Sequence, residues 1–239
     1  PLTFSGVIAD GDAEGDVLAV KVVTDRGVKL SGANTYTGGT TIAEGAKLTI
    51  TNAAALGTEG DITGAGELIC DGVLPTNTNG LTDATNWTGT VKVQNFTGGT
   101  NEGAAELNLD AYGNANSVVE LANVAGWVAD GTVVENLKLS GSFSQNNGST
   151  SAAAKVTIKK LSGAGNFNGP SGSDWQYGFI VNDCSEFTGS VNLKSGGHGG
   201  QIGLIIGTEP ADYAHTNYKT HITVTADGKL SAHYENTVL

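Results

Sequence analysis

The sequence contains no methionine, only two cysteines and four prolines among 239 residues, and a single arginine, Arg26. Charged residues make up 15% of the chain, well below the quarter that is usual for soluble globular proteins. No apolar run reaches the length of about 18 residues that a membrane-spanning helix needs, so no such helix is predicted. Low charge and 38% hydrophobic residues also argue against a disordered polymer.

The few charges are mostly negative, with 24 acidic and 12 basic residues and a formal net charge of −12. Binding to a nucleic acid backbone needs clustered lysine and arginine, which this chain does not offer. Anionic membrane surfaces are disfavoured for the same reason. We therefore predict neither nucleic acid binding nor membrane insertion, and solubility is the simplest interpretation of the acidic surface.

Glycine is abundant, with 36 residues, about twice its usual share. Many short β-rich runs, such as VLAVKVV (17–23), AKVTIKKL (154–161) and HITVTA (221–226), are separated by Gly, Asn and Asp. A helical period of 3.6 residues is absent except for a weak possibility in NAAAL (52–56). The pattern predicts an all-β protein of many short strands.

One motif occurs three times, as LSGANTYTGGTTI (30–42), LTDATNWTGTVKV (81–93) and VNDCSEFTGSVNL (181–193). In each copy an apolar residue is followed three positions later by a small one, and three positions after that by an aromatic residue that precedes Thr-Gly. The successive members are Leu30, Ala33 and Tyr36; Leu81, Ala84 and Trp87; and Val181, Cys184 and Phe187. We expect the three aromatic side chains to occupy equivalent, largely buried places.

A second motif occurs as ITGAGEL (62–68) and LSGAGNF (161–167). Both motifs recur at an offset of about one hundred residues, which indicates an internal duplication. We expect duplicated units over 62–160 and 161–239, behind an N-terminal half-unit, 1–61.

The repeats suggest what the cysteines do. Cys184 stands where Ala33 and Ala84 stand in the other copies, so a small, buried, apolar role explains it. Cys70 ends the run ELIC at an apolar position. Two free structural thiols are therefore predicted, and a disulfide between them is the alternative.

The run SGANTYTGGTTIAEGAKLTITNAAALGTEGDITGAGEL (31–68) contains a YTGGTT turn and strand, a second glycine-led strand, an ALG turn and a GAGEL strand, in that order. This run closely resembles the autotransporter-associated beta strand repeat. The resemblance covers less than a fifth of the chain, and the copies at Trp87 and Phe187 lack the second glycine.

The resemblance implies a right-handed parallel β-helix in the passenger region of a secreted or outer-surface bacterial protein. β-branched runs and Asn or Gly at tight corners are compatible with that fold. We expect a single elongated β-solenoid over 1–239, with about twenty residues per coil. Tandem β-sandwich domains, one for each copy, are the alternative. The repeat is a structural unit, so it implies no catalytic or ligand-binding residues.

Alternating carboxylates mark the run ADGDAEGD, at Asp10, Asp12, Glu14 and Asp16. Several carboxylate oxygens in a glycine-containing loop suit Ca²⁺. The run lacks the twelve-residue calcium-loop pattern, and a solvated acidic turn is the alternative. Calcium is the one cofactor that the sequence suggests.

Other candidate ligands are weaker. Four histidines, His198, His215, His221 and His233, have spacings that match no zinc pattern. Trp175 and Tyr177, in DWQYGF (174–179), are the aromatic residues best placed to stack on sugars. Trp87 is interpreted as a packing residue because it aligns with Tyr36 and Phe187.

We therefore expect a structural or display segment of a bacterial secreted or cell-surface protein, without catalysis. Its end coils would expose unpaired strand edges, so we expect either flanking domains of a larger chain or self-assembly through the end coils. A carbohydrate-binding adhesin module is the second possibility. A polysaccharide-acting enzyme is the third.

Overall fold

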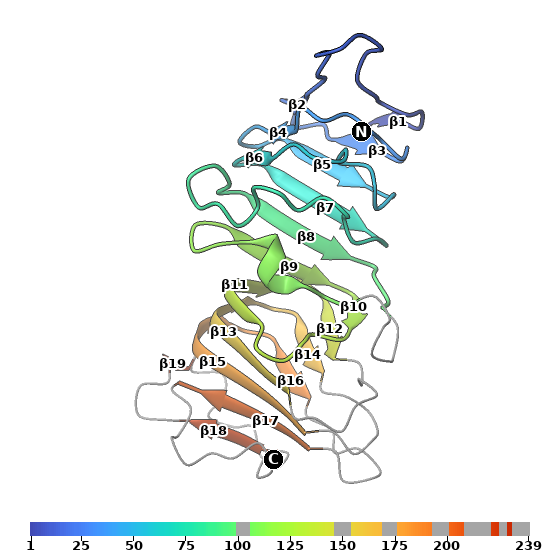
Figure 1. Cartoon of the computed structure of the whole chain (residues 1–239). Coiled ribbons are helices and arrows are strands. Elements are labelled where there is room, and N and C mark those ends of the chain that lie inside the picture. The colour runs from blue at the N-terminus through green and yellow to red at the C-terminus, as the bar shows by residue number, and fades with distance from the viewer. Residues whose placement is uncertain are drawn as a thin grey trace. The chain divides into compact units, whose positions relative to one another are not determined.

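The computed structural model describes residues 1–98, 106–145, 154–168, 176–192, 201–207, 221–224 and 229–230. The described chain is all-β apart from one short 3₁₀ helix, η1 (Leu109–Tyr112). The strands pair in parallel from coil to coil, as a β-solenoid requires (Figure 1). The predicted solenoid is confirmed, and the tandem β-sandwich is wrong because sandwich sheets are antiparallel.

The chain forms two compact units. The first consists of Pro1–Phe96 and Ala111–Glu120, and the second of Thr97–Asp110 and Leu121–Leu239. The duplicated units 62–160 and 161–239 were predicted from similarity between sequence segments. The compact units are defined by contacts, so they do not test the duplication, which stays a prediction.

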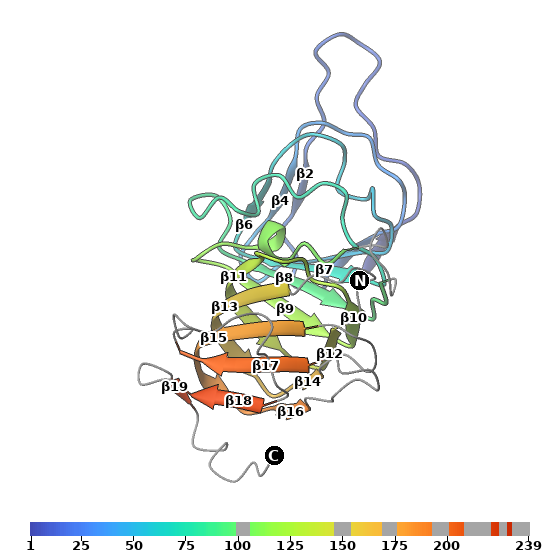
Figure 2. The same ribbon diagram turned by 60° about the horizontal axis from the view of Figure 1, so that its bottom comes forward.

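Strands of two parallel sheets build the first unit, and Figure 2 shows the strands of the smaller sheet stacked on one another. The larger contains, in order, β1 (Leu2–Phe4), β3 (Val28–Leu30), β5 (Lys47–Ile50), β7 (Glu67–Asp71) and β8 (Thr90–Gln94). The smaller contains β2 (Val20–Val22), β4 (Thr40–Ile42) and β6 (Ile62–Gly64). Val28 pairs with Leu48 and Leu48 with Leu68, so these coils contain the expected twenty residues.

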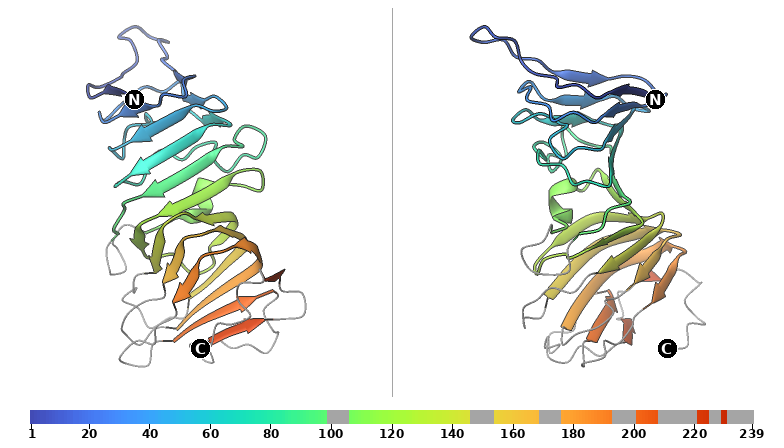
Figure 3. Two further views of the ribbon diagram at one scale, coloured as in Figure 1. Left: turned by 180° about the vertical axis from the view of Figure 1, so that it is seen from behind. Right: turned by 90° about the vertical axis from the view of Figure 1, so that its right-hand side faces the viewer.

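Strands of two of the three parallel sheets also build the second unit, and Figure 3 shows β13, β15 and β17 side by side. One consists of β10 (Val124–Gly126), β12 (Ser142–Gln145), β14 (Asn166–Asn168) and β16 (Ser190–Asn192). The other includes β11 (Val133–Leu139), β13 (Ala154–Gly163), β15 (Gln176–Phe187), β17 (Gln201–Ile206) and β18 (His221–Val224), with β19 (Lys229–Leu230) beside β15. β9 (Val118–Ala122) spans the boundary between the units.

The core consists of rows of apolar side chains that run from coil to coil. Parallel pairing in register places the same side of each strand inward, so one residue from each coil joins a row. The two rows of the larger sheet in the first unit are Leu2, Val28, Leu48, Leu68 and Val91, and Phe4, Leu30, Ile50, Cys70 and Val93. In the second unit the ring of Phe167 packs edge-on against Phe143 and Phe179, with centroids 5.6 and 4.8 Å apart.

The three repeated aromatic residues lie in this core. The side chains of Tyr36, Trp87 and Phe187 are each 0% exposed, as the repeat predicts. Each lies three or four residues before a strand, β4, β8 or β16. The aromatic residue therefore fills the interior just before the chain starts its next strand.

The small residue of the repeat does not have an equivalent place in the three copies. Cys184 is buried as expected, whereas Ala33 is exposed and Ala84 is half-buried. Ala84 lies in a turn and Ala33 in an irregular segment between strands, but Cys184 lies within the twelve-residue strand β15. The expectation of one shared buried position is wrong, because a residue three positions before the aromatic points in a different direction in a strand than it does outside one.

The corners at Trp87 and Phe187 share one pattern of main-chain hydrogen bonds. The N–H of Thr88 donates to the carbonyl of Gly64 at 2.9 Å, and that of Thr188 donates to Gly163 at 2.8 Å. Two residues on, Thr90 donates to Gly66 and Ser190 to Gly165. The motifs ITGAGEL and LSGAGNF thus form the same corner, each under an aromatic-Thr-Gly corner of the next coil.

Glycine is required where these corners stack. A Cβ atom on Gly89 would lie 2.2 Å from the carbonyl oxygen of Gly66, and one on Gly189 would lie 1.8 Å from that of Gly165. Main-chain atoms on both sides cannot move apart without lengthening the hydrogen bonds of the corner. Any side chain at these positions would therefore separate the coils.

We expect Gly89→Ala to destabilise the protein by about 1–3 kcal/mol, the usual cost of overpacking. Gly6→Ala is the matched control, because no atom lies within 4 Å of a Cβ atom at that position. Urea unfolding of both variants measures the difference. Equal stability of the two variants would show that the corners do not stack as closely as described.

We expect Trp87→Ala to cost about 3–5 kcal/mol, as large-to-small changes in packed interiors do. The indole Nε1 of Trp87 is buried and has no hydrogen-bond partner in the structure. Trp87→Phe keeps a ring and removes this polar atom, so its expected cost is only about 1 kcal/mol. Thermal unfolding of both variants checks the contrast, and similar losses in both would mean that the indole N–H has a partner.

Candidate functional site

The acidic run of residues 9–16 lies in the loop between β1 and β2, and its first carboxylate is engaged by the next coil. The Oδ1 atom of Asp10 accepts hydrogen bonds from the N–H of Leu18 at 2.8 Å and of Thr37 at 3.1 Å. Its Oδ2 atom accepts one from the Thr37 hydroxyl at 2.6 Å. These donors, above all the Thr37 hydroxyl, hold the pKa of Asp10 below its ordinary value of 3.8. Asp10 therefore fastens the loop.

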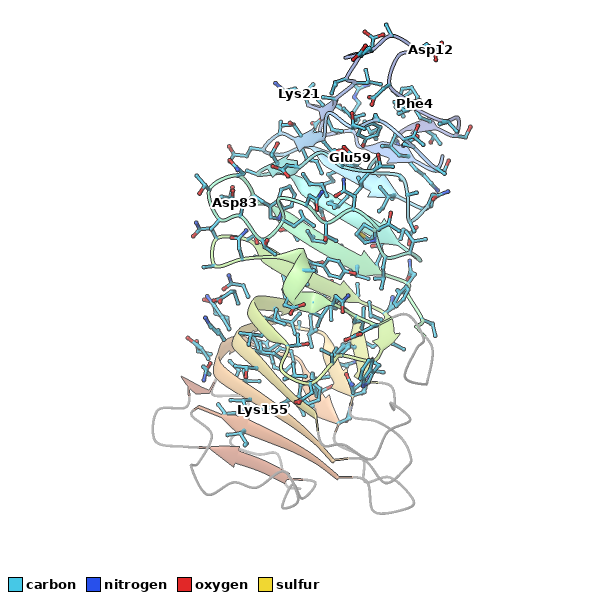
Figure 4. All side chains as sticks on the ribbon, in the orientation of Figure 1. Phe4, Asp12, Lys21, Glu59, Asp83 and Lys155 are labelled. Atoms are coloured by element: carbon cyan, nitrogen blue, oxygen red, sulfur yellow. The ribbon has the colours of Figure 1, made fainter. Side chains whose placement is uncertain are left out.

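The other three carboxylates do not join it. The carboxylate of Asp16 accepts a hydrogen bond from the N–H of Ala13 within the loop, and Asp12 and Glu14 are exposed. Figure 4 shows Asp12 at the tip of the loop, pointing away from the coils. In the described part of the chain, no group of three or more His, Cys, Asp or Glu side chains comes together as a metal site would. The geometry thus offers no support for the predicted calcium site.

The predicted sugar-stacking residues are outside what the structure describes. Trp175 lies outside the described residues, and Tyr177 lies in β15 but its side chain is not among those described. His198, His215 and His233 are also outside the described residues, and only the backbone of His221, in β18, is described. The carbohydrate-binding surface stays a prediction.

Neither cysteine forms a disulfide, and both are buried, Cys70 in the first unit and Cys184 in the second. The prediction of two structural thiols is confirmed, and the disulfide alternative is wrong. Burial raises the pKa of Cys70 to about 12, because the interior disfavours the charged thiolate. Neither residue has the exposed, electropositive surroundings of a catalytic cysteine.

The carboxyl group of Glu106 is not indicated by any of the sequence motifs. Glu106 forms a parallel bridge with Trp127, and the N–H of Leu107 donates to the carbonyl of Trp127 at 2.8 Å. Partial burial, and then the nearby charge of Asp110, raise the pKa of Glu106. A raised carboxyl pKa is a common feature of acid catalysts, but hydrolysis of sugars needs a second carboxylate across a substrate. The only signal in the sequence is the spacing of two acids within ELNLD.

Buried asparagines were also missed. Asn34, Asn77 and Asn114 each donate a side-chain amide hydrogen bond to a main-chain carbonyl, at Ala55, Gly60 and Trp87 respectively. The side-chain oxygens of Asn77 and Asn114 accept from the N–H two residues on. The repeated Asn-x-Asn in TNTNG and GNANS is the signal that predicts such turns. These amides hold corners together and are not free to bind a ligand.

Comparison with protein-family models, with curated proteins and with solved structures finds no match for this chain. Among the described residues, no helix has the length and apolar character needed to cross a membrane.

We expect Asp10→Asn to flatten the loss of stability in acid. A carboxylate with a lowered pKa stabilises the folded state above its ordinary pKa, and this contribution disappears as the pH falls through the folded value. The wild-type protein should therefore lose stability below about pH 4 more steeply than Asp10→Asn. Melting temperatures between about pH 2 and 6 measure this, with Asp12→Asn as the exposed control. Parallel curves for all three proteins would contradict the assignment.

We expect neither thiol to react with a thiol reagent at about pH 8 while the protein is folded. The thiolate is the reactive species, and burial excludes both the charge and the reagent. In denaturant, two thiols for each chain should react. Reaction of fewer than two in denaturant would indicate a disulfide, and fast reaction of the folded protein would contradict the burial of the side chains.

Proposed function

We propose that this chain is a structural segment of a bacterial secreted or cell-surface protein, a β-solenoid that spaces or displays what it carries. One observation carries the proposal: among the described residues, Asp10 and the buried asparagines, whose polar side chains could bind a ligand, hold the coils together instead. Asp10 fastens the first loop to Thr37, and the amides of Asn34 and Asn114 close corners.

The charged side chains on the outer faces support the same role. Lys47 pairs with Glu67 at 2.8 Å, Lys159 with Glu135 at 2.6 Å and Lys160 with Glu186 at 2.6 Å. Each pair joins residues of adjacent coils, so the charges also bind one coil to the next. A structure in which each coil contacts mainly its neighbours suits a spacer, because coils can be added without altering the others.

The bacterial surface setting rests on the resemblance of residues 31–68 to the autotransporter-associated beta strand repeat. The twenty-residue register of β3, β5 and β7 in that stretch is compatible with it. A surface segment would be joined to other domains or to further copies, and both kinds of partner are part of the proposal. An extracellular setting also agrees with the excess of acidic over basic residues, because an acidic surface does not attract nucleic acid.

A glycan array tests the structural role against carbohydrate binding, which the aromatic run DWQYGF favours as the second candidate. We expect the wild-type chain to bind no glycan above background. Reproducible binding that is lost in Trp175→Ala and retained in Trp127→Ala would overturn the structural role. Hydrolysis of neutral polysaccharides that is lost in Glu106→Gln would overturn it in favour of an enzyme.

A further inference from the structure

The turn of residues 78–81 contains an Asn-Gly pair, Asn79 and Gly80, for which the proposed structural role has no use. In such a pair the main-chain nitrogen of the glycine can attack the side-chain amide of the asparagine, because glycine has no side chain to shield its nitrogen. The side chain of Asn79 is exposed, so water and hydroxide reach it. The pair is therefore a candidate for a chemical change that needs no enzyme.

The attacking nitrogen is not engaged in the folded chain. The N–H of Gly80 has no hydrogen-bond acceptor among the described residues, although its carbonyl accepts from the N–H of Asp83 at 3.0 Å. An N–H that donates to no carbonyl loses its proton to solvent, and its nitrogen turns toward a neighbouring group, without first breaking a hydrogen bond. The fold thus leaves the nucleophile of the Asn79–Gly80 pair available.

Two other exposed asparagines of the first unit lack this feature. Asn86 precedes Trp87, whose N–H donates to the carbonyl of Asp83 at 2.9 Å. Asn116 precedes Ser117, whose N–H donates at 3.3 Å to the carbonyl three residues back. In both places a side chain and a hydrogen bond protect the nitrogen. These two asparagines are therefore matched controls for Asn79 within the same chain.

Asn79 holds the corner from which β6 starts. Its carbonyl accepts from the N–H of Ile62 at 2.8 Å, and its side-chain amide donates to the carbonyl of Glu59. Val20 and Thr40, the first residues of β2 and β4, donate in the same way to the coil that follows each of them, at 3.0 and 2.9 Å. A change at Asn79 therefore reaches one of the bonds that join successive coils.

We propose that Asn79 is a site of spontaneous deamidation, and that the reaction opens this corner. The nitrogen of Gly80 gives its proton to hydroxide and attacks Cγ of Asn79, while Nδ2 takes a proton from water and leaves as ammonia. A cyclic imide results. Water then opens the imide at either of its carbonyl carbons, and this gives aspartate or isoaspartate. Overall, one water molecule is consumed and one ammonia is released.

Both products weaken the corner. Aspartate no longer has the amide that donates to the carbonyl of Glu59. In isoaspartate the main chain runs through Cβ and Cγ and is longer by one bond, and the carbonyl that accepts from Ile62 becomes part of a free carboxylate. Asp61 packs against this turn, since a Cβ atom on Gly80 would lie 3.1 Å from that of Asp61. The new negative charge therefore arises beside an existing carboxylate, which repels it.

Incubation of the whole chain in mildly alkaline buffer, followed by peptide mapping with mass spectrometry, tests the site. We expect Asn79 to convert about tenfold faster than Asn86 and Asn116, roughly the factor that one protecting hydrogen bond provides. Both aspartate and isoaspartate should form, and the rate should rise with the hydroxide concentration because the nitrogen must lose its proton. Equal rates at the three asparagines, or aspartate without isoaspartate, would overturn the proposal.

Amide hydrogen exchange of the incubated chain tests the effect on the corner. The sequence contains two other Asn-Gly pairs, 147–148 and 168–169, which include residues outside the described part of the chain, so a local measurement is needed. The N–H of Ile62 should exchange faster after conversion. That of Val20, which makes the same bond two coils earlier, should not change. Converted chains in which Ile62 exchanges as slowly as before would contradict the opening of the corner.

Two variants assign the change to the imide reaction. Asn79→Thr cannot form the imide, so incubation should leave the exchange of Ile62 unaltered, whereas Asn116→Thr should age as the wild-type chain does. An equal rise in Asn79→Thr would overturn the assignment. The comparison of Asn79 with Asn86 uses only the wild-type chain, so it decides the site even if Asn79→Thr fails to fold. Glycan binding affects none of these measurements, so this inference stands or fails independently of the proposed function.

Discussion

The close stacking of main chain on main chain at the coil corners is the interaction on which the rest of this structure depends. Thr88 and Thr188 donate to glycine carbonyls of the coil before, and Gly89 and Gly189 leave no room for a side chain. This contact sets the distance between successive coils at the corners. A fixed distance keeps the strands of neighbouring coils in register. The apolar rows and the buried aromatic residues then follow, because parallel register places equivalent side chains above one another.

The sequence predicted those features that a local repeat controls. The stretch 31–68 has the expected coils, and Tyr36, Trp87 and Phe187 are buried because the glycine and strand that follow each of them turn it inward. The prediction for the small position of the same repeat is wrong, since the direction of that side chain depends on whether the residue lies in β15 or outside a strand. The pairing of β13 with β15 shifts register between Lys160 and Ser162, and no sequence pattern announced that irregularity.

The candidate site was harder to predict, because its chemistry depends on contacts between residues far apart in the chain. Alternating acids in ADGDAEGD are visible in the sequence, but Thr37, 27 residues from Asp10, decides what that carboxylate does. Burial beside the Glu106–Trp127 bridge likewise comes from the fold and not from the spacing of Glu106 and Asp110. Judged by residue type alone, carboxylates suggest a metal site and asparagines a sugar site. The hydrogen bonds of Asp10 and Asn114 show instead that these side chains hold neighbouring coils together.

Amide hydrogen exchange at single-residue resolution tests the stacked corners most directly. We expect the N–H groups of Thr88, Thr90, Thr188 and Ser190 to exchange far more slowly than those of Asp12 and Glu14 in the exposed loop, because each of the four donates to a glycine carbonyl of the preceding coil. Exchange at the four corner amides as fast as in the loop would contradict the claim that stacked main chain at these corners holds the solenoid together.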